Sequence, residues 1–234
     1  MARGPDGAAL VDRCLGLAID ALASERLPPG LYGGVAGVGW AVAHVAGVRG
    51  DDVGDALDEV DDALLRWVER APAAFDLTSG VAGVGVYALE RLPAAAGATL
   101  LASVVEALAR RAEPGPDGAR WHTSPELMSP ELRRDFPEGR HDLGMAHGTP
   151  GVVAVLRAAC AAGAALDTAR PLLADATAWL LAEAAPDDPD RSLPYWLAPG
   201  RREEAARVAW CYGDLGVAAA VGDEEAALLL ARRA

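Results

Sequence analysis

The chain has 234 residues, of which 52% are hydrophobic and 24% are charged, so a disordered chain is excluded and one domain with a sizeable core is expected. The formal net charge of −13 argues against nucleic acid as a partner, because such a surface repels phosphate groups, and it favours basic peptides. No uncharged stretch approaches the roughly 20 residues of a membrane span, and no signal peptide is recognisable. Three scattered cysteines are too few for a disulfide framework, so we expect a cytoplasmic protein.

Apolar residues recur at helical spacing along most of the chain, whereas strand patterns are weak. The predicted helices are Ala8–Glu25 with the stripe Leu10, Cys14, Leu17 and Leu22, then Val35–Val45, Asp52–Arg70, Val81–Arg91, and helices around Leu101–Leu108 and Leu172–Leu181. Proline-rich stretches predict loops over Glu113–Arg120, Thr123–Arg140 and Ala185–Arg201, with one short helix at Pro130–Asp135. Since only 5% of residues are aromatic, we expect a core built mainly from Ala, Val and Leu.

A glycine motif is repeated four times, each time between a loop and a small-residue helix. The copies are Gly34-Val-Ala-Gly37, Gly80-Val-Ala-Gly83, Gly148-Thr-Pro-Gly151 and Gly213-Asp-Leu-Gly216. The first two extend to a G-x-x-G-x-G run, but neither follows a predicted strand, so a dinucleotide-binding loop is rejected. Glycine permits tight turns and close helix approach. The repeat therefore predicts an all-α fold, in which units of outer helix, glycine loop and inner helix stack into an α/α toroid.

Four segments around these glycines resemble the motifs of one enzyme family. They are Leu31-Tyr-Gly-Gly-Val-Ala-Gly37, Asp76-Leu-Thr-Ser-Gly-Val-Ala-Gly83, Gly144-Met-Ala-His-Gly-Thr-Pro-Gly151 and Arg207-Val-Ala-Trp-Cys-Tyr-Gly-Asp-Leu-Gly216. The family is that of the LanC-type lanthipeptide cyclases (lanthionine synthetase C-like proteins). The resemblance implies a barrel of seven outer and seven inner helices, of which this chain has about four helix-pair modules. We therefore expect residues 1–234 to form a single, incomplete toroid domain that lacks the C-terminal part of the family fold.

The resemblance also implies a reaction and the residues that carry it. The family is zinc-dependent and adds peptide cysteine thiols to dehydroalanine or dehydrobutyrine, a Michael addition that forms (methyl)lanthionine thioether rings. Carried over by motif, Cys211 is a zinc ligand, His147 is the acid/base residue, and Asp76, Arg207 and Tyr212 match further catalytic positions. The implied partners are a dehydrated precursor peptide and, as a further candidate, a lanthipeptide dehydratase.

These residue types suit such a reaction. A zinc-bound thiol is deprotonated at neutral pH, which makes it a nucleophile. Attack on the β-carbon places negative charge on a carbonyl oxygen, and Arg207 or His147 can stabilise that charge. A histidine titrates in the range needed to protonate the α-carbon, and Asp76 can orient it.

Each of these residues also has a structural interpretation. Taken alone, His147 would more often be a satisfied structural residue, and Cys211 a small buried hydrophobe. Asp76 precedes a predicted helix start and can act as a cap, and Arg207 stands among charged residues typical of a solvated helix face. We further predict three residues to have packing roles only, namely Cys14, Cys160 and Trp210.

One departure from the family pattern bears on the metal. No cysteine follows Cys211 and no histidine follows His147, so the adjacent Cys-His pair that completes the family's zinc site is missing. A catalytic zinc ion needs three protein ligands, and one thiolate cannot hold it. Zinc is therefore expected from the family but doubtful in this chain. A smaller departure is Leu215, which stands where the family usually has proline.

Three explanations of the missing pair remain open: a fragment of a longer cyclase, a short protein completed by a partner chain, or a degenerate relative. The segment Asp223–Ala234 is typical of a helix start without a C-cap, which favours the fragment. The alternative function is a metal-free, non-catalytic peptide-binding or scaffold protein in a peptide-modification pathway. An α/α-toroid glycosidase ranks last, because Asp76 has no paired carboxylate. An incomplete toroid exposes apolar helix faces, so self-association is also expected.

Overall fold

The computed structural model describes residues 5–184, 193–202, 206–207 and 209–222, and this part of the chain is mainly helical. Its α-helices are α1 (Pro5–Ser24), α2 (Val35–Arg49), α3 (Asp58–Glu69), α4 (Val81–Glu90), α5 (Ala95–Arg111), α6 (Pro130–Asp135), α7 (Thr149–Ala161), α8 (Leu166–Glu183) and α9 (Asp214–Val221). The all-α prediction is confirmed, including the short helix at Pro130–Asp135. The helix expected within Asp223–Ala234 lies outside the described residues, as do residues 185–192 of the loop expected over Ala185–Arg201. No described helix combines the length and apolarity that crossing a bilayer requires.

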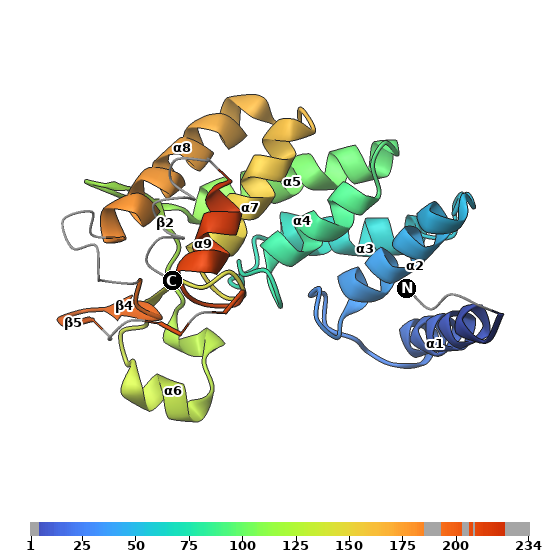
Figure 1. Ribbon diagram of the computed structural model, residues 1–234, viewed down its shortest axis with the longest axis horizontal. Helices are drawn as coiled ribbons and strands as arrows, with labels where there is room; N and C mark the ends of the chain where they lie inside the picture. The colour runs from blue at the N-terminus through green and yellow to red at the C-terminus, as the bar shows by residue number, and fades with distance from the viewer. Residues whose placement is uncertain (1–4, 185–192, 203–205, 208, 223–234) are drawn as a thin grey trace.

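The helices form two rows that follow the chain across the molecule (Figure 1). The inner row consists of the helices that the glycine motifs open, because α2 contacts α4, α4 contacts α7, and α7 contacts α9. In the outer row, α3 contacts α5 and α5 contacts α8. Helix α1 packs on α2 at one end of this arrangement. The alternation of outer and inner helices that the sequence predicts is therefore present.

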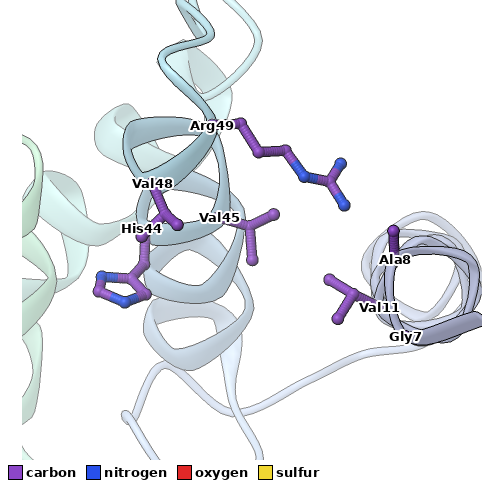
Figure 2. Close-up of a pocket in the computed structure, with 7 residues that line it drawn as sticks. All are labelled: Gly7, Ala8, Val11, His44, Val45, Val48 and Arg49. Carbon is purple, nitrogen blue, oxygen red and sulfur yellow. The ribbon is translucent and has the colours of Figure 1, made fainter. Parts of the chain in front are cut away.

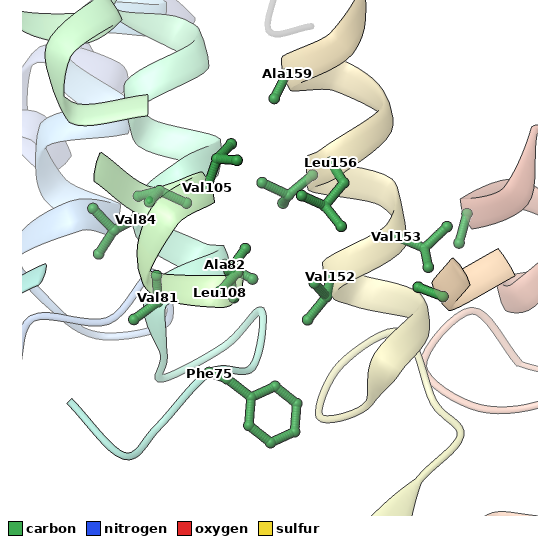
Figure 3. Close-up of a cluster of buried hydrophobic side chains, with 14 of the residues drawn as sticks. Phe75, Val81, Ala82, Val84, Val105, Leu108, Val152, Val153, Leu156 and Ala159 are labelled. Carbon is green, nitrogen blue, oxygen red and sulfur yellow. The ribbon is translucent and has the colours of Figure 1, made fainter. Parts of the chain in front are cut away.

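Small aliphatic side chains fill the space between the two rows. Figure 3 shows Ala82 of α4 with Val105 and Leu108 of α5 on one side, and Val152 and Leu156 of α7 on the other. All five side chains are fully buried or nearly so. The core expected from the low aromatic content is thus confirmed, since most of its buried members are Ala, Val and Leu.

A buried polar group ties the outer row to the inner row. Asp61 of α3 accepts hydrogen bonds from the Tyr87 hydroxyl and the Arg91 guanidinium, with Nη2 of Arg91 2.7 Å from Oδ2. The side chains of Asp61 and Arg91 are only 5% and 6% exposed. Burial, followed by the Asp61 carboxylate, raises the pKa of Tyr87 well above its ordinary value, so this phenol stays a donor.

Two segments predicted as loops contain short strands. Strands β1 (Glu113–Gly115) and β2 (Gly118–Arg120) form an antiparallel hairpin, and β3 (His141–Asp142), β4 (Trp196–Ala198) and β5 (Arg201–Arg202) form a small antiparallel sheet. The hairpin packs on α8, and the Trp121 ring that follows it is fully buried, with Nε1 donating to the Leu108 carbonyl at 3.0 Å. Burial of this tryptophan orders a stretch whose proline and glycine content indicated a loop.

The apolar stripe of α1 does not face a core in the described part of the chain. Leu17 is 63% exposed, and Leu10 and Cys14 are exposed as well, so the packing role predicted for Cys14 is wrong. Instead, α1 faces α2 across an open pocket of about 360 Å3, shown in Figure 2, with Val11 on one side and Val45 and Val48 on the other. Among the described residues, α2 is the helix that packs on α1, and much of the apolar stripe of α1 stays exposed.

The glycine repeat has one geometric cause throughout. A Cβ on the second glycine of each motif would lie 1.9–2.4 Å from the backbone oxygen of the residue six positions earlier; the pairs are Gly37 with Leu31, Gly83 with Leu77, Gly151 with Met145, and Gly216 with Trp210. Side-chain carbon atoms do not approach so closely, so only glycine fits at this position in the first turn of each inner helix. The segments of seven residues that fold back in this way are named the glycine loops below: 28–34, 74–80, 142–148 and 207–213, the last without residue 208, which is not among the described residues.

Candidate functional site

The glycine loops lie beside one another at the N-terminal ends of the inner helices. The backbone N–H of Tyr32 in the first loop donates to the Thr78 carbonyl in the second at 2.9 Å. The N–H of Ala146 in the third loop donates to the Cys211 carbonyl in the fourth at 3.4 Å. These two bonds join equivalent positions, because each of these four residues stands two positions before the first glycine of its motif. Side chains at equivalent positions of the four loops are therefore brought to one end of the fold.

The second and third loops meet through Asp76 and His147. Oδ1 of Asp76 accepts hydrogen bonds from the N–H groups of Thr78 and Ser79 and from the Thr78 hydroxyl, each at 2.8 Å. The same oxygen lies 3.6 Å from Nδ1 of His147. Nδ1 is also 3.1 Å from the Thr78 hydroxyl oxygen. Because that hydroxyl donates to Asp76, it accepts from His147, which assigns a proton to Nδ1.

The surroundings shift both of these titrating groups. Burial alone would raise the pKa of Asp76, but hydrogen bonds from His147, Ser79 and Thr78 outweigh it, and the pKa lies below its ordinary value. The Asp76 carboxylate raises the pKa of His147, against a smaller opposing effect of burial, and the charge of Asp142 adds to the increase. The pair therefore favours a carboxylate beside an imidazolium. The His147 side chain is 50% exposed, and its Nε2 has no partner within the described chain, so that atom can exchange a proton.

A buried carboxylate joins the third and fourth loops. Asp142 accepts from the Thr123 hydroxyl at 3.0 Å and from Nε of Arg140 at 3.2 Å, and the Tyr212 hydroxyl donates to it at 3.4 Å. Burial raises the pKa of Asp142, and the Arg140 guanidinium opposes that increase. Burial and the charge of Asp142 raise the pKa of Tyr212 well above its ordinary value. Tyr212 is therefore a neutral donor at physiological pH.

Cys211 and Arg207 lie in the fourth loop. Nη2 of Arg207 is 3.9 Å from the sulfur of Cys211, which is partly buried, whereas Arg207 is exposed. A Cβ at Gly144 would lie 2.3 Å from the Cys211 carbonyl oxygen, so glycine lets the third loop approach the fourth. The structure thus brings Asp76 and His147 into contact and Arg207 and Cys211 into contact, and it joins these pairs through neighbouring loops.

Zinc is the cofactor that the family implies, and the described residues do not fit it. In the portion of the chain with defined positions, no three His, Cys, Asp or Glu side chains are grouped so that they could hold a metal ion. Around the sulfur of Cys211 the structure places the Arg207 guanidinium, which is a cation and not a metal ligand. A catalytic zinc ion requires three protein ligands.

Sequence reasoning missed three residues of this region and misplaced one. Thr78, Asp142 and Arg140 hold the candidate site residues in position and were not predicted. Alignment of the four loops gives the missing signal for Thr78, because it occupies the position that Cys211 has in the fourth loop. Trp210, predicted to pack in the core, is 54% exposed, since its backbone and not its ring approaches Gly216.

Fold and loops together define a class of protein: an all-α fold of paired outer and inner helices, whose glycine loops bring an aspartate and a histidine into contact. The sequence matches the family described as "Lanthionine synthetase C-like protein" over residues 5–223, and the chain belongs to this family. Among solved structures, nisin cyclase is similar, with a TM-score of 0.78 and 18% sequence identity. That match covers 100% of this chain and 64% of the nisin cyclase chain, so this chain spans less than two thirds of that structure. A comparison with curated proteins found no match.

Proposed function

We propose that the described residues form the acid–base half of a lanthipeptide-cyclase site. The observation that carries this proposal is the contact of Asp76 and Thr78 with His147, beside the loop that holds Cys211 and Tyr212. In this proposal the substrate is a dehydrated peptide, and the product is a thioether. Asp76, His147, Arg207 and Tyr212 are the proposed catalytic residues.

The proposed reaction has two bond-forming events. A thiolate sulfur bonds to the β-carbon of dehydroalanine, and the π electrons move onto the adjacent carbonyl oxygen to give an enolate. The enolate then takes a proton at its α-carbon from Nε2 of the His147 imidazolium. Asp76 keeps that imidazolium charged before the transfer, because it raises the pKa of His147. Arg207, as a cation, and the neutral Tyr212 hydroxyl are the groups that can stabilise the enolate oxygen.

The donor set around Cys211 favours a second candidate function. One cysteine beside an arginine offers no metal site among the described residues, so these residues do not supply metal activation of a substrate thiol. A metal-free, non-catalytic peptide-binding or scaffold protein would need the loops but not the proton transfer. The two candidates therefore differ in whether His147 accelerates a reaction.

The experiment supplies the thiolate from outside. The full chain is mixed with a capped dehydroalanine peptide and an aryl thiol that is already ionised at neutral pH, and thioether formation is followed by mass spectrometry. We expect the chain to accelerate the addition. His147→Ala should lower the rate of thioether formation at least ten-fold, since general acid catalysis typically contributes about 10²–10⁴-fold.

The matched control is His122→Ala. The His122 ring lies outside the Asp76–His147 contact and bonds to the Glu138 carbonyl, so its loss should leave the rate unchanged. A wild-type chain that binds the peptide without accelerating the addition would overturn the proposed catalysis and support the scaffold function.

A further inference from the structure

An apolar pocket lies beside the first glycine loop, which is hydrogen-bonded to the loop that holds Asp76. It has a volume of about 430 Å3 and is lined by uncharged residues only, namely Leu31, Tyr32, Gly33, Gly37, Trp40 and Val86. Volumes of about 300–1,000 Å3 are typical of pockets that take small ligands. The pocket is an uncharged opening in a protein whose net charge is −13.

The walls of this pocket are held in place by the helices behind it. The Trp40 ring of α2 stacks on the His44 ring, with centroids 4.7 Å apart and planes 9° from parallel. His44 in turn is 2.9 Å from a carboxylate oxygen of Glu90 on α4, so the stack spans two inner helices. At the mouth, Tyr32 is 62% exposed, so its ring is available to a ligand. A fixed aromatic wall loses little conformational freedom when an apolar group packs on it.

Hydrogen bonds link one wall of the pocket to the acid–base pair through Thr78. Tyr32 donates its N–H to the Thr78 carbonyl at 2.9 Å, and the Thr78 hydroxyl contacts His147 at 3.1 Å. A Cβ at Gly30 would lie 2.7 Å from Cα of Ser79, which shows how closely the first loop lies against the second. Tyr32 also occupies the loop position that Thr78 and Cys211 have in their own loops, so it stands on the same end of the fold.

We propose that this pocket binds an apolar side chain of the substrate peptide, next to the residue that reacts at His147. The inference rests on the proposed function and deepens it, because it names a sequence preference of the peptide. An aromatic or large aliphatic side chain would bury apolar surface against Trp40 and Val86, which stabilises the complex in proportion to the apolar area removed from water. Charged side chains would lose hydration there without finding a partner.

The test measures binding of two capped, cysteine-free pentapeptides to the full chain. They are identical except for a central Phe or Ala, and neither contains a dehydrated residue. The chain is labelled with 5-fluorotryptophan, and the fluorine signal of Trp40 is assigned by its loss in Trp40→Phe. We expect the Phe peptide to shift the Trp40 signal and to bind at least ten-fold more tightly than the Ala peptide.

Two variants locate the binding, and a third is the matched control. Val86→Phe fills the pocket from α4, and Tyr32→Ser removes the exposed ring at its mouth, so both should abolish the preference for Phe. Val48→Phe makes the same change at the far end of α2, where Val48 lines the separate pocket against α1, and should leave the preference intact. Circular dichroism checks that each variant is folded, and Tyr32→Ser remains informative if Val86→Phe does not fold.

Each outcome decides the proposal separately from the proposed function. Equal affinity for the two peptides, no binding of either, or a preference that survives both pocket variants would overturn the pocket. A preference that depends on the pocket, in a chain that does not accelerate thioether formation, would leave the pocket standing and remove the catalysis. Thioether formation whose rate does not depend on the side chain next to the reacting residue would support the catalysis and overturn the pocket.

Discussion

Asp76 occupies a loop position at which two of the other loops have glycine. Gly30 and Gly144 stand at the equivalent place, four residues before the first glycine of their motifs, and a Cβ at either would collide with the next loop. A residue at this position therefore faces the following loop at close range. Asp76 uses that proximity to reach His147, so the repeat itself explains why an acid and a base from different modules meet.

The Asp76–His147 contact predicts a shift in the titration of the histidine. In Asp76→Asn the pKa of His147 should fall towards its ordinary value, because the carboxylate that raises it is gone. The pH dependence of the His147 ring signals in an NMR titration measures this directly. Glu90→Gln, which alters the carboxylate beside His44, is the control and should leave the His147 titration unchanged.

The Asp76–His147 contact also predicts how the stability of the fold depends on pH. A raised pKa of His147 means that its stabilising effect is present at low pH and is lost as pH rises through that pKa. A lowered pKa of Asp76 means that its effect is lost as pH falls through that pKa. Wild type should therefore exceed Asp76→Asn in stability most clearly between the two values. An equal difference at all pH values would contradict the ion pair.

Site residues that stand in a sequence motif could be predicted, whereas residues whose role depends on a long-range contact could not. His147, Asp76 and Cys211 stand in motifs, so they could be named as candidates from the sequence. Asp142 gains its neighbours from Thr123 and from the fourth loop, which no local pattern reveals. The predicted packing roles of Trp210 and Cys14 were wrong for the same reason. Whether either side chain is buried depends on which element of the fold lies opposite it.

The glycine loops predict opposite effects for one substitution at two glycines. Gly151→Ala places a Cβ 2.4 Å from the Met145 carbonyl oxygen and should destabilise the fold by about 1–3 kcal/mol, as overpacking does. Gly47→Ala lies within α2 with nothing in reach of a Cβ, and should stabilise by about 0.5–1 kcal/mol through helix propensity. Urea unfolding of both variants measures the difference, and effects of the same sign would contradict the close approach.

The buried ion pair between α3 and α4 predicts a large loss from a small truncation. Asp61→Ala leaves the Arg91 guanidinium buried without its partner and should cost about 3–5 kcal/mol. Asp62→Ala is the matched control, because the Asp62 side chain is 72% exposed. Its ion pair with Arg66 lies on the surface and is long, with Nη1 of Arg66 3.8 Å from Oδ2 of Asp62. Its effect should stay within about 0.5 kcal/mol. Similar losses in the two variants would show that the buried pair does not hold the rows together.

Elements with their own periodic signal could be predicted, and elements defined by a partner could not. Helix α6 follows Ser129, whose hydroxyl caps Leu132, and proline at its first position, so its bounds could be read from the chain. The β1–β2 hairpin contains turn residues but too few apolar ones to indicate strands. It forms because Gly118 fits against α8, where a Cβ would meet the Asp175 carbonyl.

At the scale of the whole molecule, the two rows leave α1 with little cover. Leu17 on this helix is 63% exposed, and α1 packs on α2 with an open pocket between them. Apolar side chains on an uncovered helix favour association with another surface. Self-association through this face stays a prediction. Sedimentation velocity tests it, since Leu17→Glu should lower any association without changing the helical content.

The last prediction concerns metal and ring formation by the 234-residue chain as a whole. We expect the purified chain to hold little zinc through dialysis and to form no rings alone on a dehydrated precursor whose cysteines are ordinary alkyl thiols. Structural zinc sites gain about 10–16 kcal/mol of apparent binding free energy from a full ligand set, whereas the described donors offer Cys211 beside a cation. Without a metal a substrate cysteine stays mostly protonated at neutral pH, so His147 has no enolate to protonate. Metal analysis followed by mass spectrometry of the precursor makes the measurement. Near-stoichiometric zinc that survives dialysis would contradict this expectation, and would require ligands from His44, His122, His141, a carboxylate or a second subunit.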